Sequence, residues 1–257
     1  MKERIYTIPI NEAFDKDSEC PICICERKLE NDALEYAIGP AMMEPDNRIE
    51  TNKKGFCANH FAKLYNFEKN RLPLALVIDT HMVEQIKEIE DIFKVYGLSS
   101  GDEIKGPLKA FKSAFFGMKQ DGKAIDQLVK KLESLEKTCA VCDKIEHNLD
   151  KLIENTLYLY SKEPEFKKKF INSRGFCLKH FKMLLKKASK TLSASSMTEF
   201  IDDIVPLELK ALKRVQEDVN HFTKMFDYRN QNADWKNSRD AVPRSIEKLS
   251  GPCDLKR

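Results

Sequence analysis

Cysteine and histidine fall into two short motifs in this sequence, and each motif occurs twice. A Cys-x-x-Cys motif spans residues 20–23 and 139–142, and a Gly-Phe-Cys-x-x-His motif spans residues 55–60 and 175–180. Ligands three positions apart share one face of a helical turn, and three thiolates with one imidazole form a closed tetrahedral zinc site. We predict eight metal ligands: Cys20, Cys23, Cys57, His60, Cys139, Cys142, Cys177 and His180.

Paired in chain order, the motifs predict two zinc ions, each held by a Cys-x-x-Cys and the Gly-Phe-Cys-x-x-His that follows it. Residues 24–56 would then separate the two half-sites of the first ion. Two alternatives stay open. An iron–sulfur cluster can also be held by three cysteines and a histidine, and labile, redox-active thiolates are favoured by Cys25, a third thiol beside the first motif.

These motifs are part of an internal repeat. The Cys-x-x-Cys and a Glu-Pro pair at 44–45 both recur after 119 residues, and the Gly-Phe-Cys-x-x-His recurs after 120. Such self-similarity indicates a repeated structural unit. We predict a first metal-binding helical repeat at 1–97, a linker and connecting helix at 98–122, a second metal-binding helical repeat at 123–226 and a polar, aromatic tail at 227–257.

Helices are expected to position the motifs. Apolar residues of the 196–226 segment recur three and four positions apart, which is typical of a helix with one buried face, and no segment shows the alternation of a strand. Gly55 and Gly175 are expected to adopt φ > 0 and to allow a sharp entry into the helix that follows. Helices are expected near residues 26–43, 58–70, 73–96, 107–118, 124–137, 143–161, 178–190 and 196–226.

The predicted fold class is therefore all-α, with two pseudo-repeated, metal-stapled helical units packed together and a C-terminal strap. Proline lacks a backbone donor and disfavours helix in the residue before it. The Glu-Pro pairs at 44–45 and 163–164 are accordingly expected to be turns that stop a helix.

Composition fits a globular protein, with 42% hydrophobic and 33% charged residues and a net charge of only +3. No run of about 18 apolar residues is present, so we expect neither a membrane span nor, at the start of the chain, a signal peptide. The expected compartment is the cytoplasm, where cysteines serve metal ligation more often than disulfide formation.

Catalytic motifs are absent from the sequence. It contains no Gly-x-Ser-x-Gly, no phosphate-binding loop and no dinucleotide-binding glycine motif. A closed Cys3His site also lacks an open position for water or substrate. These observations favour a non-enzymatic protein, and the leading hypothesis is a zinc-stapled scaffold that binds a protein partner.

At these residues the sequence resembles an uncharacterised bacterial family, a domain of unknown function found largely in anaerobic Firmicutes. The likeness covers residues 8–14, both Cys-x-x-Cys motifs, both Gly-Phe-Cys-x-x-His motifs, and, near the C-terminus, residues 226–230, Trp235 and residues 238–244. The resemblance supports the architecture and implies no activity.

The C-terminal tail has two interpretations. Its polar and aromatic residues either form a partner-binding surface or strap the helices, with Trp235 as the apolar anchor and Arg–Asp pairs fixing the path; the strap is favoured. The partner-binding candidates are Asp227, Tyr228, Arg229, Asn230 and Trp235.

A basic segment supports a third functional hypothesis, nucleic-acid binding. Residues 162–190 contain ten Lys or Arg and two Glu, and a helical stripe of lysines can follow phosphates. The alternative is a solvated helix face. The lysines of the stripe are Lys179, Lys182, Lys186 and Lys190.

Overall fold

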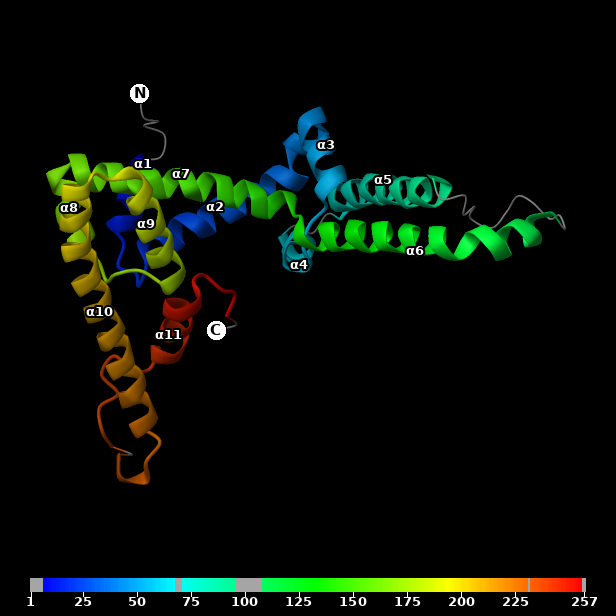
Figure 1. The fold of residues 1–257 in the computed structure, drawn as a ribbon. Coiled ribbons are helices and arrows are strands. Elements are labelled where there is room, and N and C mark those ends of the chain that lie inside the picture. Colours follow the sequence, from blue (N-terminus) through cyan, green and yellow to red (C-terminus); the bar gives the residue numbers. More distant parts are fainter. Residues whose placement is uncertain (1–6, 68–70, 96–107, 231, 256–257) are drawn as a thin grey trace. The chain divides into compact units, whose positions relative to one another are not determined.

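A computed structural model describes residues 7–67, 71–95, 108–230 and 232–255. Within these ranges the chain is helical and contains no strand, which confirms the all-α fold (Figure 1). None of the described helices combines the length and apolar character needed to cross a membrane. The helices are α1 (Thr7–Phe14), α2 (Pro21–Ile38), the 3-10 helix η2 (Pro40–Met43), α3 (Pro45–Lys54), α4 (Ala58–Phe67), α5 (Leu72–Val95), α6 (Leu108–Lys137), α7 (Ala140–Lys162), α8 (Pro164–Ile171), α9 (Leu178–Thr191), α10 (Ala194–Lys224), the 3-10 helix η3 (Tyr228–Asn230) and α11 (Ala241–Ser250).

The chain divides into two compact units. Unit 1 combines Met1–Leu29 with Glu146–Arg257, and unit 2 is Glu30–Ile145. Helices α2 and α7 each contribute residues to both units. The units are thus assembled from other segments than the predicted ranges 1–97 and 123–226, because residues 7–29 pack with residues 146–255.

Several helices of this fold begin at a proline, which the sequence analysis did not predict. The helix expected from residue 26 begins at Pro21, and Pro45 and Pro164 occupy the first turns of α3 and α8. The first position of a helix needs no backbone donor and suits the fixed φ of proline. The second Glu-Pro pair does stop a helix as expected, since α7 ends at Lys162. At both pairs, however, a new helix begins at the proline, so the expectation of plain turns was wrong.

Other differences concern helix number. Residues 107–118 and 124–137 were expected to form two helices, yet α6 runs from Leu108 to Lys137 without a break. Helices α1 and α11 were not anticipated. They are only 8 and 10 residues long, and helices this short depend on packing rather than on local propensity.

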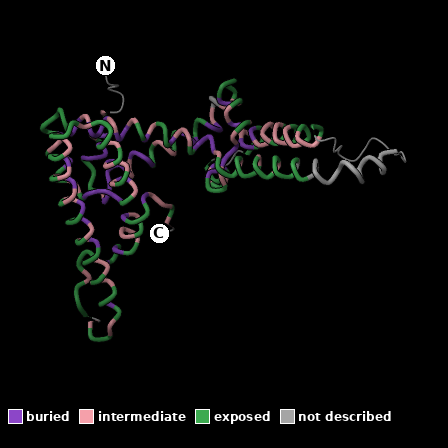
Figure 2. Tube along the Cα trace, in the orientation of Figure 1, coloured by how far each residue is buried: buried purple, intermediate pink, exposed green. Residues whose placement is uncertain are grey.

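Unit 1 has an aromatic core. Phe14 of α1 contacts the rings of Phe166, Phe170 and Phe176, with ring centroids 4.9, 5.8 and 6.2 Å apart. The last three side chains are at most 1% exposed, and buried residues continue along α7, α9 and α10 (Figure 2). This packing places α1, and therefore the first Cys-x-x-Cys motif that follows it, beside α8 and the second Gly-Phe-Cys-x-x-His motif.

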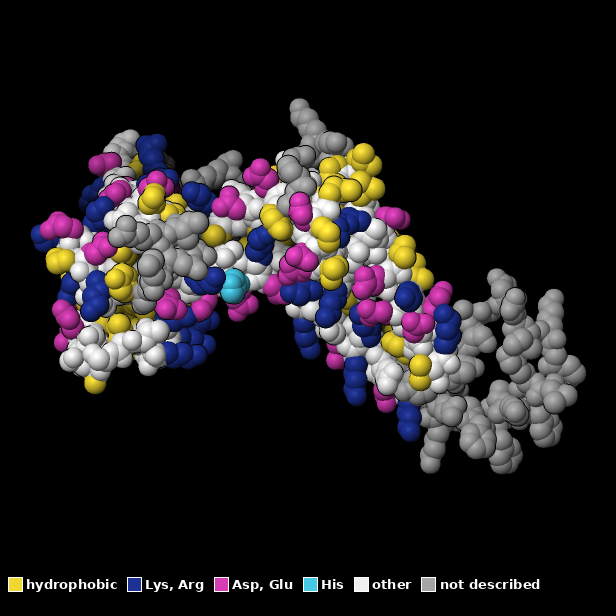
Figure 3. All heavy atoms as spheres, turned by 90° about the horizontal axis from the view of Figure 1, so that it is seen from above, with side chains coloured by type: hydrophobic (Ala, Val, Ile, Leu, Met, Phe, Trp, Pro, Cys, Tyr) yellow, Lys and Arg dark blue, Asp and Glu magenta, His cyan; other side chains and the backbone are white. Residues whose placement is uncertain are grey.

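Unit 2 has a smaller core, in which Phe56 and Leu64 pack with Val77, Val141 and Ile145. Helices α5 and α6 of this unit lie side by side (Figure 1) and are mostly exposed or half-buried in the described part. Hydrophobic side chains lie among charged ones on this surface (Figure 3).

Candidate metal centres

Four helix N-termini carry the eight predicted ligands. In each case one ligand directly precedes the helix and the second lies in its first turn, three residues later. Cys20, Cys57, Cys139 and Cys177 precede α2, α4, α7 and α9, respectively. The backbone N–H of Cys142 donates to Sγ of Cys139 over 3.4 Å, and that of His180 donates to Sγ of Cys177 over 3.5 Å. Partial positive charge at a helix N-terminus favours the thiolate form.

The structure pairs these half-sites crosswise. Cys20 and Cys23 lie with Cys177 and His180, and we call this group the unit 1 site. The chain-order pairing of Cys20 and Cys23 with Cys57 and His60 was therefore wrong.

Cys57 and His60 instead lie with Cys139 and Cys142 in the unit 2 site. All eight predicted residues are thus brought into two Cys3His groups, each wholly within one unit. Packing of α1 against α8 accounts for the exchange, since it brings the first Cys-x-x-Cys to the second Gly-Phe-Cys-x-x-His.

Donor-atom spacings fit a single ion in each site. In the unit 1 site, Nδ1 of His180 lies 3.2 to 3.4 Å from the three sulfurs, and the sulfurs of Cys23 and Cys177 are 3.5 Å apart. In the unit 2 site, Nδ1 of His60 lies 3.2 to 3.3 Å from the sulfurs, and those of Cys57 and Cys142 are 3.9 Å apart. Around one tetrahedral zinc, donor atoms stand about 3.5 to 3.8 Å apart.

Each histidine turns its other nitrogen toward a carboxylate. Nε2 of His60 hydrogen-bonds Oε1 of Glu30 over 3.1 Å, and Nε2 of His180 lies 3.1 Å from Oε2 of Glu26. Lys63 donates to both oxygens of Glu30 over 2.7 Å. Carboxylates in this position orient a ligating imidazole and raise its basicity. Both come from α2, and the sequence reading did not identify them.

The pKa values of the unit 2 site reflect these contacts when no ion is bound. Burial disfavours the imidazolium, but hydrogen bonds to Cys139 and Glu30 outweigh it and raise the pKa of His60 to about 10. Burial likewise opposes ionisation of Cys139, yet the hydrogen bond from His60 lowers the pKa of that thiol to about 6. The hydrogen bond from His60, against burial, lowers the pKa of Glu30 to about 2. A metal ion must therefore displace a proton from His60, so acid favours release of the ion.

Gly55 and Gly175 have φ of 60° and 82°, which confirms the expected positive φ. Space also requires glycine at both positions. A Cβ on Gly55 would lie 2.6 Å from the His81 ring, and one on Gly175 would lie 2.8 Å from Cβ of Ala211. The backbone can therefore turn sharply into Cys57 and Cys177 only without a side chain.

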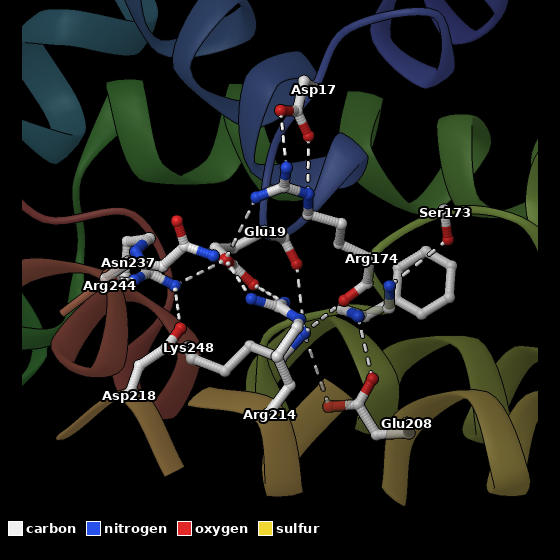
Figure 4. A network of polar contacts seen from close by, with 12 residues as sticks. Asp17, Glu19, Ser173, Arg174, Glu208, Arg214, Asp218, Asn237, Arg244 and Lys248 are labelled. Carbon is white, nitrogen blue, oxygen red and sulfur yellow. Dashed lines mark hydrogen bonds and ion pairs between the residues drawn. The ribbon is translucent and has the colours of Figure 1, made fainter. Parts of the chain in front are cut away.

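A buried lysine joins the two half-sites of the unit 1 site (Figure 4). Nζ of Lys248, on α11, donates to the carbonyl oxygens of Glu19 and Arg174 over 3.1 and 2.9 Å. These carbonyls lie immediately before Cys20 and three residues before Cys177. Glu208 accepts from the N–H of Phe176 over 2.8 Å and lies 3.9 Å from Lys248. Lys248 and Glu208 are 1% and 2% exposed, so this pair fixes the backbone behind the ligands.

The unit 2 site uses a shorter bridge. The hydroxyl of Thr138 donates to the carbonyl of Lys54 over 3.0 Å, and the N–H of Ala140 donates to the carbonyl of Gly55 over 3.0 Å. These bonds flank Cys139 on both sides and hold it against the Gly-Phe-Cys turn. In the unit 2 site the two half-sites are thus joined by direct hydrogen bonds, whereas Lys248 joins them in the unit 1 site.

The tail lies along the end of α10, in the manner of a strap. The Trp235 ring packs on Phe222 and Phe226 with centroids 5.9 and 6.0 Å apart, and Arg244 pairs with Asp218 over 2.9 Å. Of the other four predicted partner-binding residues, Tyr228, Arg229 and Asn230 form η3, and Asp227 directly precedes it. Asp227 pairs with Arg229, Asn230 donates to the carbonyl of Lys224 and Tyr228 is 79% exposed.

The basic stripe lies on α9. Lys179 pairs with Glu26 and so belongs to the surroundings of the unit 1 site. Lys182, Lys186 and Lys190 are exposed. Other cations of the 162–190 segment form ion pairs: Lys167 with Glu199 and Asp203, Lys187 with Asp150, and Arg174 with Asp17. These pairs reduce the positive charge that the segment offers to a polyanion.

Cys25 is separate from the metal centres. Its thiol is buried, lies 3.7 Å from the carbonyl oxygen of Pro9 and has a pKa that burial raises to about 12. A protonated, buried thiol is unreactive. Cys25 is therefore a packing residue of α2.

A family model supports the resemblance that the motifs suggested. The model is described as a family of unknown function (DUF6062), and it matches residues 1–256. The chain belongs to DUF6062. No curated protein and no solved structure matches it. This DUF6062 member thus carries two Cys3His groups that could each hold a metal ion.

The crosswise pairing can be tested by 113Cd NMR on cadmium-loaded protein. We expect two resonances, and we expect Cys20→Ser and Cys177→Ser to disturb the same one, since both residues belong to the unit 1 site. Cys57→Ser and Cys142→Ser should disturb the other. If Cys20→Ser and Cys57→Ser affected one common resonance, the chain-order pairing would be correct.

Removal of the Glu30 charge should weaken the unit 2 site. We expect Glu30→Gln to lower its zinc affinity by about 10- to 100-fold, because the partner of a ligating imidazole tunes its basicity. Competition with a chromophoric chelator measures the change. Glu35→Gln, an exposed position on the same helix, serves as the matched control and should leave both affinities unchanged; equal affinities for Glu30→Gln and wild type would contradict the assigned role.

Lys248→Met should destabilise the unit 1 site selectively. The substitution leaves two buried carbonyls and the Glu208 carboxylate without their cation, at a cost of about 3 kcal/mol in the free energy of unfolding. Denaturant unfolding measures the loss, and the cadmium spectrum should show broadening only at the unit 1 resonance. Lys210→Met, on the exposed side of α10, is the control. Equal effects on both resonances would show that Lys248 acts on the fold as a whole.

Proposed function

We propose that this DUF6062 member is a helical scaffold in which two zinc ions, one in each unit, tie together distant segments and support a surface for a protein partner. The supporting observation is that three sulfurs and one imidazole nitrogen gather within 4.8 Å of one another, twice. Four protein ligands leave a tetrahedral ion no open position for water or substrate, which favours a structural role.

Spacing and ligand type favour zinc over an iron–sulfur cluster. The thiolates of a cluster bind different iron atoms, so they stand further apart than ligands around one ion. Here the neighbouring sulfurs of Cys23 and Cys177 are 3.5 Å apart. Thiolate and imidazole at tetrahedral spacing are the preferred surroundings of Zn²⁺.

An ion in either site would close a long loop. Cys23 and Cys177 are 154 residues apart, and Cys57 and Cys142 are 85 apart. By analogy with a disulfide, a link across about 100 residues removes close to 5 kcal/mol of unfolded-chain entropy in a chain-entropy treatment. Zinc would thus contribute to stability mainly by joining segments that the chain itself leaves far apart.

Support for a protein partner comes from unit 2. Apolar side chains recur along one face of α5 at spacings of four, seven and three, and others lie exposed on α6. Exposed apolar side chains that recur along one helix face can mark an interaction site. The side chains, 41 to 61% exposed, are Leu72, Leu76, Val83, Ile86, Ile125, Val129 and Leu132. All eight cysteines are free thiols, and we propose a reducing compartment, the cytoplasm.

A metal-responsive role is a second candidate, and one difference between the sites favours it. Cys142 of the unit 2 site is exposed and Cys57 is half-buried, whereas Cys177 and His180 of the unit 1 site are 0% exposed. Exposed thiolates exchange metal and meet oxidants more readily. On this hypothesis the unit 2 site would release its ion first.

Metal content tests the proposal directly. Elemental analysis of protein purified without added metal should give two zinc ions per chain, and one for either Cys177→Ser or Cys57→Ser. Chelation of both ions should lower the melting temperature by at least about 10 °C, since a loss of several kcal/mol shifts it by a few degrees per kcal/mol. Iron in place of zinc, or full stability without metal, would overturn the structural-zinc proposal.

A further inference from the structure

The segment after α10 and the surface of α10 enclose a pocket of about 280 Å³ in unit 1. It lies apart from the ligands of the metal centres, and none of them lines it. Five cations and two aspartates, Asp218 and Asp240, face it, so the lining carries a charge of +3. The cations are Arg174, Arg214, Lys236, Arg239 and Arg244.

Carboxylates hold three of these cations in place (Figure 4). Arg174 makes a two-point contact with Asp17 at 2.6 Å, and Arg214 makes one with Glu19 at 2.9 and 2.5 Å. A guanidinium has five N–H donors, and each of these pairs engages only two of them closely. Both arginines line the pocket, and their carboxylate partners fix them there, which lowers the entropy cost of ordering these side chains around a ligand.

Two further cations at the pocket remain uncompensated. Within the described part of the chain, Lys236 and Arg239 make no ion pair, and both are exposed. Arg239 lies over the Trp235 ring, with Cζ 5.9 Å from its centroid. Lys236 has φ of 49°, a left-handed conformation that a side chain rarely adopts, and its N–H donates to Asp234. Arg174, Arg214 and Arg244 contact four carboxylates, which are Asp17, Glu19, Asp218 and Asp240. The five cations of the pocket and these four carboxylates therefore sum to a charge of +1, and the unpaired Lys236 and Arg239 carry it at the rim.

We propose that this pocket binds a small molecule bearing a phosphate group. A phosphate monoester carries about −1.5 to −2 charges near neutral pH and offers three strong acceptor oxygens. Two cations without a carboxylate partner, Lys236 and Arg239, could pair with such a group at the rim of the pocket. Arginine suits this task because its planar donors match the geometry of phosphate oxygens. The volume of 280 Å³ admits a phosphate with a modest organic group. The pocket gives a role to residues 236–244, which the metal centres leave unexplained.

Calorimetric titration of the zinc-loaded full chain with pyrophosphate and with inorganic phosphate tests the proposal. We expect saturable binding of pyrophosphate, weakened at least tenfold by the double substitution Lys236→Ala/Arg239→Ala. Zinc content and melting temperature should stay unchanged, because both side chains are exposed. Lys182→Ala/Lys186→Ala removes the same charge from the exposed face of α9, outside the pocket, and should change the affinity less than twofold.

Three outcomes would overturn the proposal. The first is an absence of saturable binding of both phosphates to the wild-type protein. The second is an equal loss of affinity in the α9 control, which would indicate unspecific attraction to net charge. The third is tighter binding of a single-stranded oligonucleotide without terminal phosphates, lost on substitution of Lys236 and Arg239, which would make the pocket part of a nucleic-acid surface.

Discussion

The structure depends on the meeting of helix N-termini in pairs. Each of α2, α4, α7 and α9 begins with a cysteine and presents a second ligand one turn later. Because the partial charge of a helix start favours thiolates, four such starts are four ready half-sites. Two of them, brought face to face, complete the donor set that one tetrahedral ion requires.

Crosswise pairing makes unit 1 discontinuous in sequence, while unit 2 is one continuous stretch that begins within α2 and ends within α7. Cys20 and Cys23 leave their own half of the chain and join Cys177 and His180, so the first 29 residues belong to unit 1. The aromatic contacts of Phe14 explain why, since burying this ring among Phe166, Phe170 and Phe176 outweighs any preference for a neighbour closer in sequence. The aromatic core of unit 1 and the metal ligands thus favour the same pairing of half-sites.

Helix α2 supplies a carboxylate to the ligating histidine of each site. Its Glu26 faces His180 of the unit 1 site, and its Glu30, one turn later, faces His60 of the unit 2 site. No carboxylate of α7 takes the corresponding role among the described contacts. The two sites share ligand type and geometry, yet differ in what fixes their backbone: a buried lysine from α11 in one, and a threonine hydroxyl in the other.

The sequence by itself determined what is local. Short-range spacing and propensity predict the ligand pairs three residues apart, the positive φ of the glycines and the helical fold. The structure confirms the positive φ and the all-α fold, and it gathers all eight predicted ligands into two groups. The order of pairing was decided by tertiary structure. The two Cys-x-x-Cys half-sites are chemically alike, as are the two Gly-Phe-Cys-x-x-His half-sites, so the sequence contains no signal that tells which pairs with which. Only the packing of α1 on α8, and of α11 behind the unit 1 site, selects between them. Glu26, Glu30 and Lys248 were missed for the same reason: their roles arise from residues 30 to more than 200 positions away.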